Sequence, residues 1–401
     1  MQSLSELIAT YNKPDILLDS FNPSSKKYAA WGFDEIFEIN HKGCFLNNEK
    51  IDGDYFQILQ NIISKWKQDT PSNQLACIGF ISYEFKKFIY EHIQFSKKSK
   101  NNFPYLWFCK PKLVQEFSDT SIIEYSEGQL EIIQDIMDYS QYSEKIDAIK
   151  SSLECGDVYQ INFTDFKKIK SSFKSSFDLY LSLREISKPN EGFFLKTDHF
   201  DILSLSPELF IKVENQKICT APIKGTRPSM GNLNQDKAVQ NELQKSIKDR
   251  AEHLMIVDLL RNDLGKICEI GSIEVTNLYD IKSFETIHHM VSNIQGLLKN
   301  NITEVDIIKA LFPGGSITGA PKESAMFLID QLETSARNIY TGIAGYIRGS
   351  GDMSFNICIR TLLRTNDVYE YGVGGGIVWD SIAKHEWKEA HQKSKILESL
   401  L

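Results

Sequence analysis

The 401-residue sequence lacks the cysteine patterns of a disulfide-rich or zinc-binding protein. Its seven cysteines are odd in number and widely spaced, with no Cys-x-x-Cys pair and no cluster with histidine. Such thiols are typical of buried positions in a reducing compartment. No apolar stretch reaches the ~18 residues of a membrane span, and Met1–Lys13 lacks the basic-then-apolar order of a signal peptide. We therefore expect a cytoplasmic protein with no membrane partner.

The sequence also lacks an excess of basic residues. It contains 45 Lys and Arg against 53 Asp and Glu, which gives a formal net charge of −8. Because nucleic acids are bound through a basic face, this balance argues against a nucleic-acid partner. A small anionic substrate would need a local cationic pocket instead.

Complete nucleotide-binding loops are absent as well, although two stretches are rich in glycine. In Phe312–Lys322, Ala320 and Pro321 occupy the places where a P-loop requires Lys and then Ser or Thr. In Gly372–Gly376, the last glycine of a dinucleotide fingerprint is replaced by Trp379. Either stretch can be a plain tight turn. Either can also present backbone N–H groups to a carboxylate, since glycine lets the main chain approach closely.

The order of apolar runs and turn residues predicts an α/β (α+β) protein with mainly antiparallel sheets packed with helices. Residues 1–125 read as a strand-rich region, and residues 139–401 as a second region that shares one sheet system with it. A helix from about 142 to 156 opens the second region. We expect further helices at about 236–262 and 383–400, and strands at 201–205, 209–213, 218–221, 343–347, 355–363 and 369–373.

Two of the predicted helices carry acidic residues on their apolar faces. Glu386 and Glu389 share a helical stripe with Leu397, and Asp249 and Glu252 share one with the apolar residues that follow them. Inward-facing carboxylates cost several kcal/mol unless they are paired or bind a metal. Buried ion pairs are one explanation, with Arg250, Arg261 or Lys393 as partners. A magnesium site built from hard oxygen ligands on two helices is the other.

Lys224 stands in Pro-Ile-Lys-Gly-Thr, at the end of a strand-like run and before a loop. Ser206-Pro207-Glu208 lies on a neighbouring strand-like stretch. A primary amine in a pocket at such a position can serve as a nucleophile. Taken alone, a solvated lysine beside a turn is the simpler interpretation.

The motifs resemble the chorismate-utilising enzymes in order and spacing over about residues 139–400. They are Pro222–Thr226, Asp258–Gly265 (Asp-Leu-Leu-Arg-Asn-Asp-Leu-Gly), His288–Ser292, Phe312–Lys322, Ile359–Thr361 and Gly374–Ser381. Within this family, the chain most resembles the aminodeoxychorismate synthase component I branch, which carries Pro-Ile-Lys-Gly-Thr. The anthranilate synthase component I branch has Ala at the lysine place, so Lys224 is the discriminating residue.

The resemblance implies an anthranilate synthase component I-like fold and a reaction of chorismate with ammonia that gives 4-amino-4-deoxychorismate. It implies that Lys224 attacks the ring while Glu208 protonates the leaving hydroxyl. The cofactor implied is Mg²⁺, held by Glu252 and Glu389 with Glu386 and Asp249 in support. It implies that Tyr346 and Arg360 bind the enolpyruvyl carboxylate of the substrate. The other cavity residues that it implies are His289, Ser316, Thr318, Gly375, Gly376 and Lys393.

Ammonia needs a source, and no cysteine stands in the Gly-x-Cys-x-Gly elbow of a glutaminase. We therefore expect a separate glutamine amidotransferase subunit as partner.

Leu18, Asp19 and Ser20 resemble half of the tryptophan pocket of the anthranilate enzymes. The segment Lys188–Gly192 departs from the other half, Asn-Pro-Ser-Pro-Tyr, so tryptophan binding stays open.

Three alternative functions remain at this level. Anthranilate synthase component I activity would use the same pocket if Lys224 were unreactive. Isochorismate or salicylate synthase activity would use water in place of ammonia. A non-catalytic, metabolite-sensing or scaffold protein would be a decayed form of the fold, but each of the implied catalytic positions carries a competent side chain.

Overall fold

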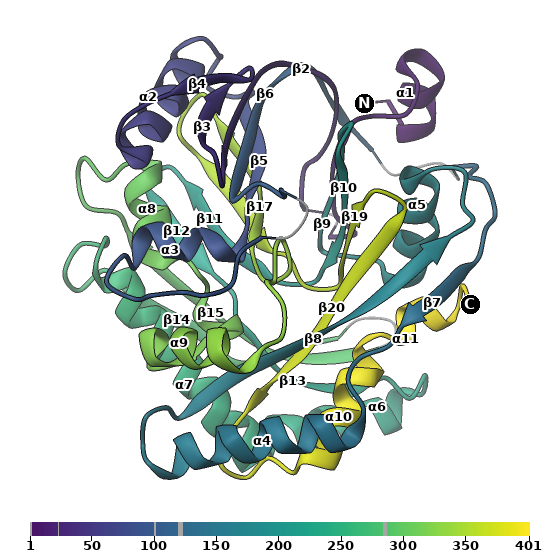
Figure 1. Ribbon diagram of the computed structural model, residues 1–401, viewed down its shortest axis with the longest axis vertical. Coiled ribbons are helices and arrows are strands. Elements are labelled where there is room, and N and C mark those ends of the chain that lie inside the picture. The colour runs from purple at the N-terminus through teal and green to yellow at the C-terminus, as the bar shows by residue number, and fades with distance from the viewer. Residues whose placement is uncertain (1, 23, 100–101, 119–122, 284–286) are drawn as a thin grey trace.

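The protein is described from a computed structural model that covers residues 2–22, 24–99, 102–118, 123–283 and 287–401. Helices pack on the outside of a large antiparallel β-system (Figure 1). The helices are α1 (Leu4–Tyr11), α2 (Tyr55–Gln68), α3 (Lys86–Ile89), α4 (Tyr139–Glu154), α5 (Ser176–Ser187), α6 (Leu233–Lys245), α7 (Ile247–Gly265), α8 (Glu304–Leu311), α9 (Lys322–Leu332), α10 (Ala383–Lys393) and α11 (Lys395–Glu398), with the 3₁₀ turns η1 (Tyr83–Phe85) and η2 (Gly315–Ile317).

The strands occur singly or in runs between these helices along the chain. They are β1 (Ile16–Asp19), β2 (Lys27–Asn40), β3 (Gly43–Leu46), β4 (Glu49–Ile51), β5 (Leu75–Ile81), β6 (Leu106–Phe117), β7 (Leu130–Gln134), β8 (Gln160–Ser171), β9 (Glu191–Lys196), β10 (Phe200–Ser206), β11 (Leu209–Glu214), β12 (Lys217–Thr220), β13 (Ile223–Pro228), β14 (Glu274–Ser283), β15 (Ile287–Leu297), β16 (Gly319–Ala320), β17 (Ile343–Arg348), β18 (Met353–Ile357), β19 (Thr361–Thr365) and β20 (Val368–Ile377).

Strand pairing joins the N-terminal region to the rest of the chain. β1 pairs with β9, and β5 pairs with β17 from Ile343 to Arg348. These contacts run between segments far apart in sequence, so the first 125 residues share hydrogen-bonded sheet with the later ones. The longest pairing outside the N-terminal region joins β20 to β8, from Tyr369 opposite Ile169 to Ile377 opposite Ile161.

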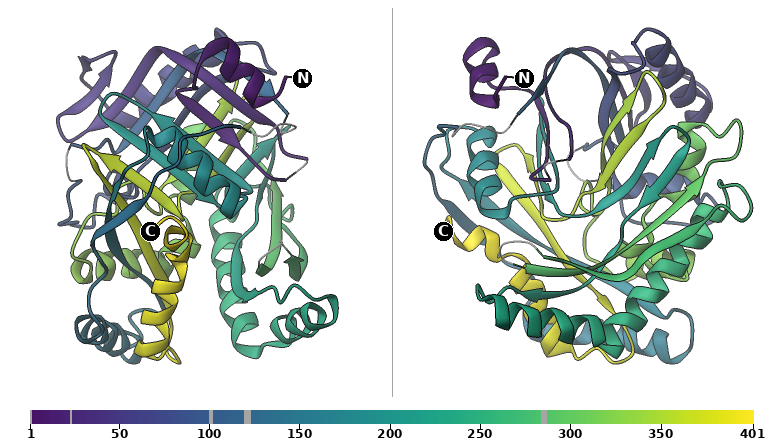
Figure 2. Two further views of the ribbon diagram at one scale, coloured as in Figure 1. Left: turned by 90° about the vertical axis from the view of Figure 1, so that its right-hand side faces the viewer. Right: turned by 180° about the vertical axis from the view of Figure 1, so that it is seen from behind.

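The lower half of the molecule divides into two arms, which the left view of Figure 2 shows side by side. One arm contains α4 and α10, which lie against β8 and β20. The other contains α6 and α7, which pack on β13, β14 and β15. Apolar side chains hold each helix in place. Ile146 and Ile149 of α4 and Ile256 and Val257 of α7 are all buried in the largest core cluster.

Several predicted elements are interrupted in the structure. The helix expected at 236–262 is two helices, because extended Ser246 ends α6 and caps α7 through a bond from the Asp249 N–H. The helix expected at 383–400 breaks at Ser394 into α10 and α11. The strand expected at 355–363 divides into β18 and β19 around Arg360, whose φ of +50° departs from the extended backbone of a regular strand. The first region also carries α1 and α2 beside its strands.

The Gly372–Gly376 stretch is not a turn but part of strand β20. Beyond Tyr371 this strand pairs with β8 and no longer with β19, so one of its edges is open where the glycines lie. In the described parts of the chain, all seven cysteines are free thiols. No helix there combines the length and the apolar character that crossing a bilayer requires.

Candidate active site

A cavity of about 1950 Å³ lies between the two arms and extends toward the N-terminal strands. It is larger than the ~300–1,000 Å³ of most ligand pockets, so it has room for more than one small molecule. Most of the residues singled out in the sequence line it: Leu18, Asp19, Ser20, Glu208, Lys224, Asp249, Glu252, His289, Ser316, Tyr346, Arg360, Gly375, Gly376, Glu386, Glu389 and Lys393. The exception is Thr318. Its hydroxyl is buried and donates to the Gly314 carbonyl at 2.9 Å, so the predicted role in lining the cavity is wrong for that residue.

Lys224 extends from β13 into the cavity. Its side chain is 18% exposed, and its Nζ lies 3.5 Å from Oε2 of Glu252 on α7. Gly225 follows with φ of +80°, where an added Cβ would lie 3.1 Å from Asp249. That glycine lets β13 turn closely past α7 and brings the amine to the carboxylate. The bland interpretation, a solvated lysine beside a turn, therefore does not describe Lys224.

Gly376 on β20 faces the same amine. A Cβ added at Gly376 would lie 2.6 Å from Nζ of Lys224 and 3.1 Å from Cδ of Gln160. The neighbouring Gly375 faces side chains of α10, since a Cβ there would lie 3.5 Å from Nζ of Lys393 and 3.6 Å from Glu386. The glycines thus leave open the space in which the amines and carboxylates of both arms meet.

Glu208 is a buried acid on the loop between β10 and β11. Its Oε1 accepts a hydrogen bond of 2.8 Å from the hydroxyl of Ser316, which lies in η2. Burial raises the pKa of Glu208 from 4.5 to about 7, although the Ser316 hydrogen bond and the positive charge of Lys224 act in the opposite direction. A carboxyl group with this pKa can hold a proton near neutral pH and donate it.

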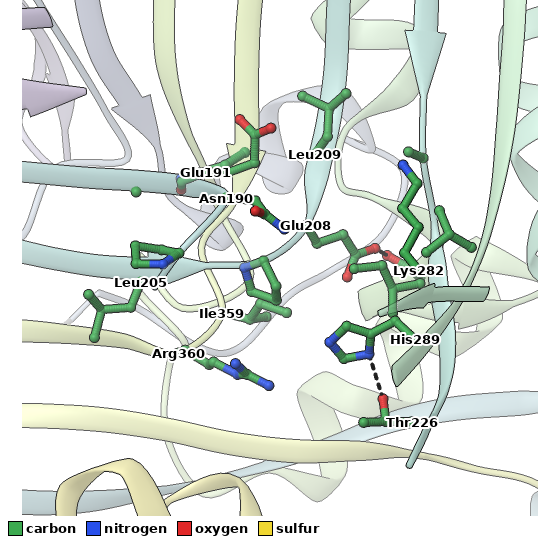
Figure 3. Close-up of a pocket in the computed structure, with 18 of the residues that line it drawn as sticks. Asn190, Glu191, Leu205, Glu208, Leu209, Thr226, Lys282, His289, Ile359 and Arg360 are labelled. Carbon is green, nitrogen blue, oxygen red and sulfur yellow. Dashed lines mark hydrogen bonds between the residues drawn. The ribbon is translucent and has the colours of Figure 1, made fainter. Parts of the chain in front are cut away.

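His289 and Arg360 complete this part of the wall. Figure 3 shows the side chains of Glu208, His289 and Arg360 directed into a common space. Nδ1 of His289 lies 2.9 Å from the hydroxyl of Thr226. Burial lowers the pKa of His289 to about 4, and the charge of Arg360 adds to the effect, so the imidazole is neutral at pH 7. Among the described residues, the Arg360 guanidinium has no ion pair or hydrogen bond, which leaves it available to an anion.

The acidic residues of the two helices have different partners. Asp249 accepts a 2.9 Å hydrogen bond from Arg227, so this carboxylate is committed to an ion pair. Glu389 lies 2.8 Å from Nζ of Lys393, whose charge lowers the pKa of that carboxyl. Burial raises the pKa of Glu386, and the negative charge of Glu389 adds to the rise. Of the ion pairs considered from the sequence, the one with Lys393 is the one that forms among the residues the structure describes.

The donor chemistry of this space fits magnesium. Carboxylate oxygens from two helices suit a hard divalent cation. The ammonium of Lys224 beside Glu252 and that of Lys393 beside Glu389 already supply positive charge there. Within the described ranges no three acidic, histidine or cysteine side chains cluster closely enough to hold a metal alone. Substrate oxygens and water would have to supply the remaining ligands.

Tyr346 and Arg360, which the resemblance pairs on one substrate carboxylate, both line the cavity. The charges that act on the Tyr346 hydroxyl are those of Arg348, Lys212 and Glu191, in the part of the cavity next to β5 and β17. Tyr340 is the tyrosine near the glycine strand. Its buried ring lines the cavity and would collide with a Cβ at Gly372, at 2.3 Å. Sequence reasoning missed it because one tyrosine before a strand carries no special signal.

Gln160 is a second residue that sequence reasoning missed. It is fully buried at the start of β8, and neither its amide oxygen nor its amide nitrogen has a hydrogen-bond partner within the described residues. Its amide faces Gly376, the glycine that also faces Lys224. A buried, unpaired carboxamide costs free energy unless a ligand satisfies it. A glutamine between Tyr159 and Ile161 gave no signal of this role.

The stretch that resembles half of a tryptophan pocket lies at the far end of the cavity. Asp19 is buried and paired with Arg184, whose Nη2 lies 3.4 Å from Asp19 Oδ1. The Ser20 hydroxyl donates to the Asn190 carbonyl. Neither the carboxylate nor the hydroxyl is therefore free for a ligand in this structure.

Residues 123–399 match the model of the family described as chorismate binding enzyme. The chain belongs to this family. Aminodeoxychorismate synthase component 1 of Bacillus subtilis (strain 168) is 31% identical over 449 aligned positions, which cover 99% of this chain and 93% of that protein. Anthranilate synthase component 1 of Saccharolobus solfataricus is 33% identical over 344 positions, which cover 81% and 80%.

A solved structure shows the same fold. The crystal structure of anthranilate synthase component I from Streptococcus pneumoniae TIGR4 superposes with a TM-score of 0.79 at 24% identity, and covers 94% of this chain and 92% of that one. The predicted family and the predicted antiparallel α/β fold are therefore confirmed. Relatives of this chorismate-binding enzyme carry the names of two different activities, so the choice between them depends on the cavity.

Proposed function

We propose that this chain converts chorismate and ammonia into 4-amino-4-deoxychorismate, a precursor of p-aminobenzoate and folate. The observation that carries the proposal is the position of Lys224. Its amine lies inside the cavity, against Gly376 and 3.5 Å from Glu252, and Glu208 lines the same space with a raised pKa. A nucleophilic amine beside a proton donor is what covalent substitution of a ring hydroxyl requires.

The proposed reaction proceeds in two balanced steps. The Lys224 amine first loses its proton and attacks C2 of the ring. The ring double bonds shift, and the C4 hydroxyl leaves as water with a proton from Glu208. Ammonia then attacks C4, the double bonds shift back, the lysine leaves C2, and the proton that the incoming ammonia loses returns to Glu208. The net change is replacement of the C4 hydroxyl by an amino group, with one water released.

Other residues would bind and orient the substrate. The unpaired guanidinium of Arg360 suits one carboxylate, and neutral His289 can hydrogen-bond the substrate without adding charge. Glu252, Glu386 and Glu389 would hold Mg²⁺, which when bound neutralises the ring carboxylate of the substrate. Asp249, paired with Arg227, would support them from outside.

The residues favour ammonia over water as the incoming nucleophile. The buried amide of Gln160 is uncharged and is not a base, so it cannot take a proton from water. It can donate and accept hydrogen bonds to an ammonia molecule beside Gly376. This supports an aminating enzyme over the isochorismate alternative. The name component 1 of the relative implies a second component, and we propose that it is a glutamine amidotransferase that delivers ammonia.

A single incubation tests the proposal. We expect the purified chain with chorismate, Mg²⁺ and ammonium salt to form 4-amino-4-deoxychorismate, identified by its mass, and to form nothing when glutamine replaces ammonium. Fluorescent anthranilate as the product would show the anthranilate branch to be correct. Isochorismate formation would show that water is the nucleophile. No conversion, under conditions where chorismate still binds, would support the non-catalytic alternative.

Gly376→Ala should lower the activity of the protein without lowering the stability of its fold. The added Cβ would lie 2.6 Å from Nζ of Lys224, the end of a flexible side chain, so the amine moves aside while the fold persists. A displacement of about 1 Å at a reacting group costs roughly 100-fold in rate. We expect that loss of kcat with a nearly unchanged melting temperature. Gly265→Ala is the matched control, because nothing lies within 4 Å of its added Cβ. Full activity of Gly376→Ala would refute the assigned position of the amine.

A further inference from the structure

Arg337 lies behind the cavity wall and does not face the cavity. Its side chain is 1% exposed and sits between α9 and β17. Its Nη1 donates to the Ile317 carbonyl at 2.9 Å, and its Nη2 donates to the Asn162 carbonyl at 2.6 Å. One planar group therefore joins η2 to strand β8. Neither acceptor is a side chain, so a sequence pattern gives no sign of the contact.

Both segments held by Arg337 carry groups of the proposed chemistry. Ile317 directly follows Ser316, whose hydroxyl donates to Glu208 at 2.8 Å. Asn162 follows Gln160 by two residues on β8, and its own amide donates to the Ile317 carbonyl at 3.0 Å. A shift of η2 would move Ser316 away from Glu208.

Arg337 is itself rigidly held. Glu333 accepts from its Nε at 2.9 Å and from its Nη2 at 2.6 Å, and the Tyr83 ring lies 4.4 Å from Cζ. Its backbone N–H donates to Glu84 at 2.7 Å. Tyr83 and Glu84 belong to η1 of the N-terminal region. Arg337 therefore connects η1 of the N-terminal region to η2. Its guanidinium holds η2 in a fixed position, because its hydrogen-bond donors lie in one plane.

We propose that Arg337 is a positioning residue for the acid Glu208, acting through Ile317 and Ser316. This inference rests on the proposed function, in which Glu208 donates a proton. A lysine at position 337 would keep the charge beside Glu333. It would lose the planar guanidinium that donates to the Ile317 and Asn162 carbonyls at the same time. Ser316 would then leave Glu208, and the carboxylate form of Glu208 would lose a stabilising hydrogen bond.

The test follows Glu208 directly and does not depend on turnover. Glutamate labelled with ¹³C at Cδ reports each carboxyl by NMR, and Glu208→Gln identifies the signal that belongs to Glu208. In Arg337→Lys we expect the titration midpoint of Glu208 to rise by roughly one pH unit, the size of one lost hydrogen bond to a carboxylate. Ser316→Ala should produce the same rise, and the double variant should produce no further rise.

Controls separate positioning from a general loss of structure. Arg184→Lys changes another buried, carboxylate-paired arginine and should leave the Glu208 midpoint unchanged. If Arg337→Lys does not fold, Arg337→Gln with Glu333→Gln removes both charges together and leaves no unpaired buried ion. An unchanged midpoint in the Arg337 variants, or additive shifts with Ser316→Ala, would overturn the inference. An inactive native chain would refute the proposed function alone, since the titration needs no substrate.

Discussion

Lys224→Ala should abolish both the covalent intermediate and most of the turnover. With chorismate, Mg²⁺ and ammonium, we expect product formation to fall by roughly 10³-fold, because the variant lacks the amine that attacks the ring in the proposed reaction. Acid quenching of the native chain during turnover should trap a fraction of the protein with added mass on the peptide that carries Lys224. The same peptide from the variant should show no added mass.

Two further variants separate nucleophilic from electrostatic roles. Lys224→Arg keeps a positive charge beside Glu252 but cannot attack at neutral pH, so we expect it to be as inactive as the alanine variant. Lys248 lies 3.9 Å from the same carboxylate and is far more exposed, at 55% against 18%. Lys248→Ala should lose far less activity. A Lys224→Arg variant that retained most of the native rate would eliminate the covalent route.

The central chemistry was accessible from sequence because each motif carries its own local signal. Lys224 stands in Pro-Ile-Lys-Gly-Thr, and Glu252 and Glu389 share the apolar stripes of their helices. The structure places all three around one cavity. Helical spacing was enough to place these acids on the cavity side of their helices, because it is a property of the segment itself, although the Glu389 side chain is 53% exposed there. Their partners, Lys224 for Glu252 and Arg227 for Asp249, come from another strand and no spacing predicts them.

What sequence reasoning missed depends on tertiary contacts. Gln160 has a place in the proposed site because β20 brings Gly376 opposite its amide. Arg337 has its proposed positioning role because two backbone carbonyls accept hydrogen bonds from its guanidinium. The wrong element boundaries have the same origin. Apolar spacing continues through Ser246 and Arg360, but a side-chain cap at the first and a left-handed backbone at the second end the regular structure. Tyr346 and Tyr340 both precede or lie in β17, and only the fold shows which of them reaches the glycine strand.

Glu208→Gln should remove the proton donor and lower kcat by roughly 10²- to 10⁴-fold. The native rate should also depend on pH in a way that this residue explains. A general acid works only while protonated, and burial raises the pKa of Glu208 to about 7, so the native rate should fall as pH rises through about 7. Glu208→Gln should lack this decline. The measurement is kcat from pH 5.5 to 9 for both proteins, with saturating ammonia at each pH.

Glu191→Gln is the control for Glu208→Gln, because burial raises the pKa of Glu191 to about 7 in the same cavity. If the decline of kcat with pH persists in Glu191→Gln and disappears in Glu208→Gln, Glu208 is the group that causes it. The opposite result would assign the role of general acid to Glu191.

The stability of the fold gives an independent check. A carboxyl whose folded-state pKa is raised destabilises the fold as pH rises from 4.5 to 7, by on the order of 3 kcal/mol above that range. Glu208→Gln should therefore melt higher than the native chain at pH 8 while being far less active, and equally high at pH 4. A lower melting temperature at pH 8 would mean that the native fold gains stability from the ionised acid, which is incompatible with a group kept protonated for catalysis.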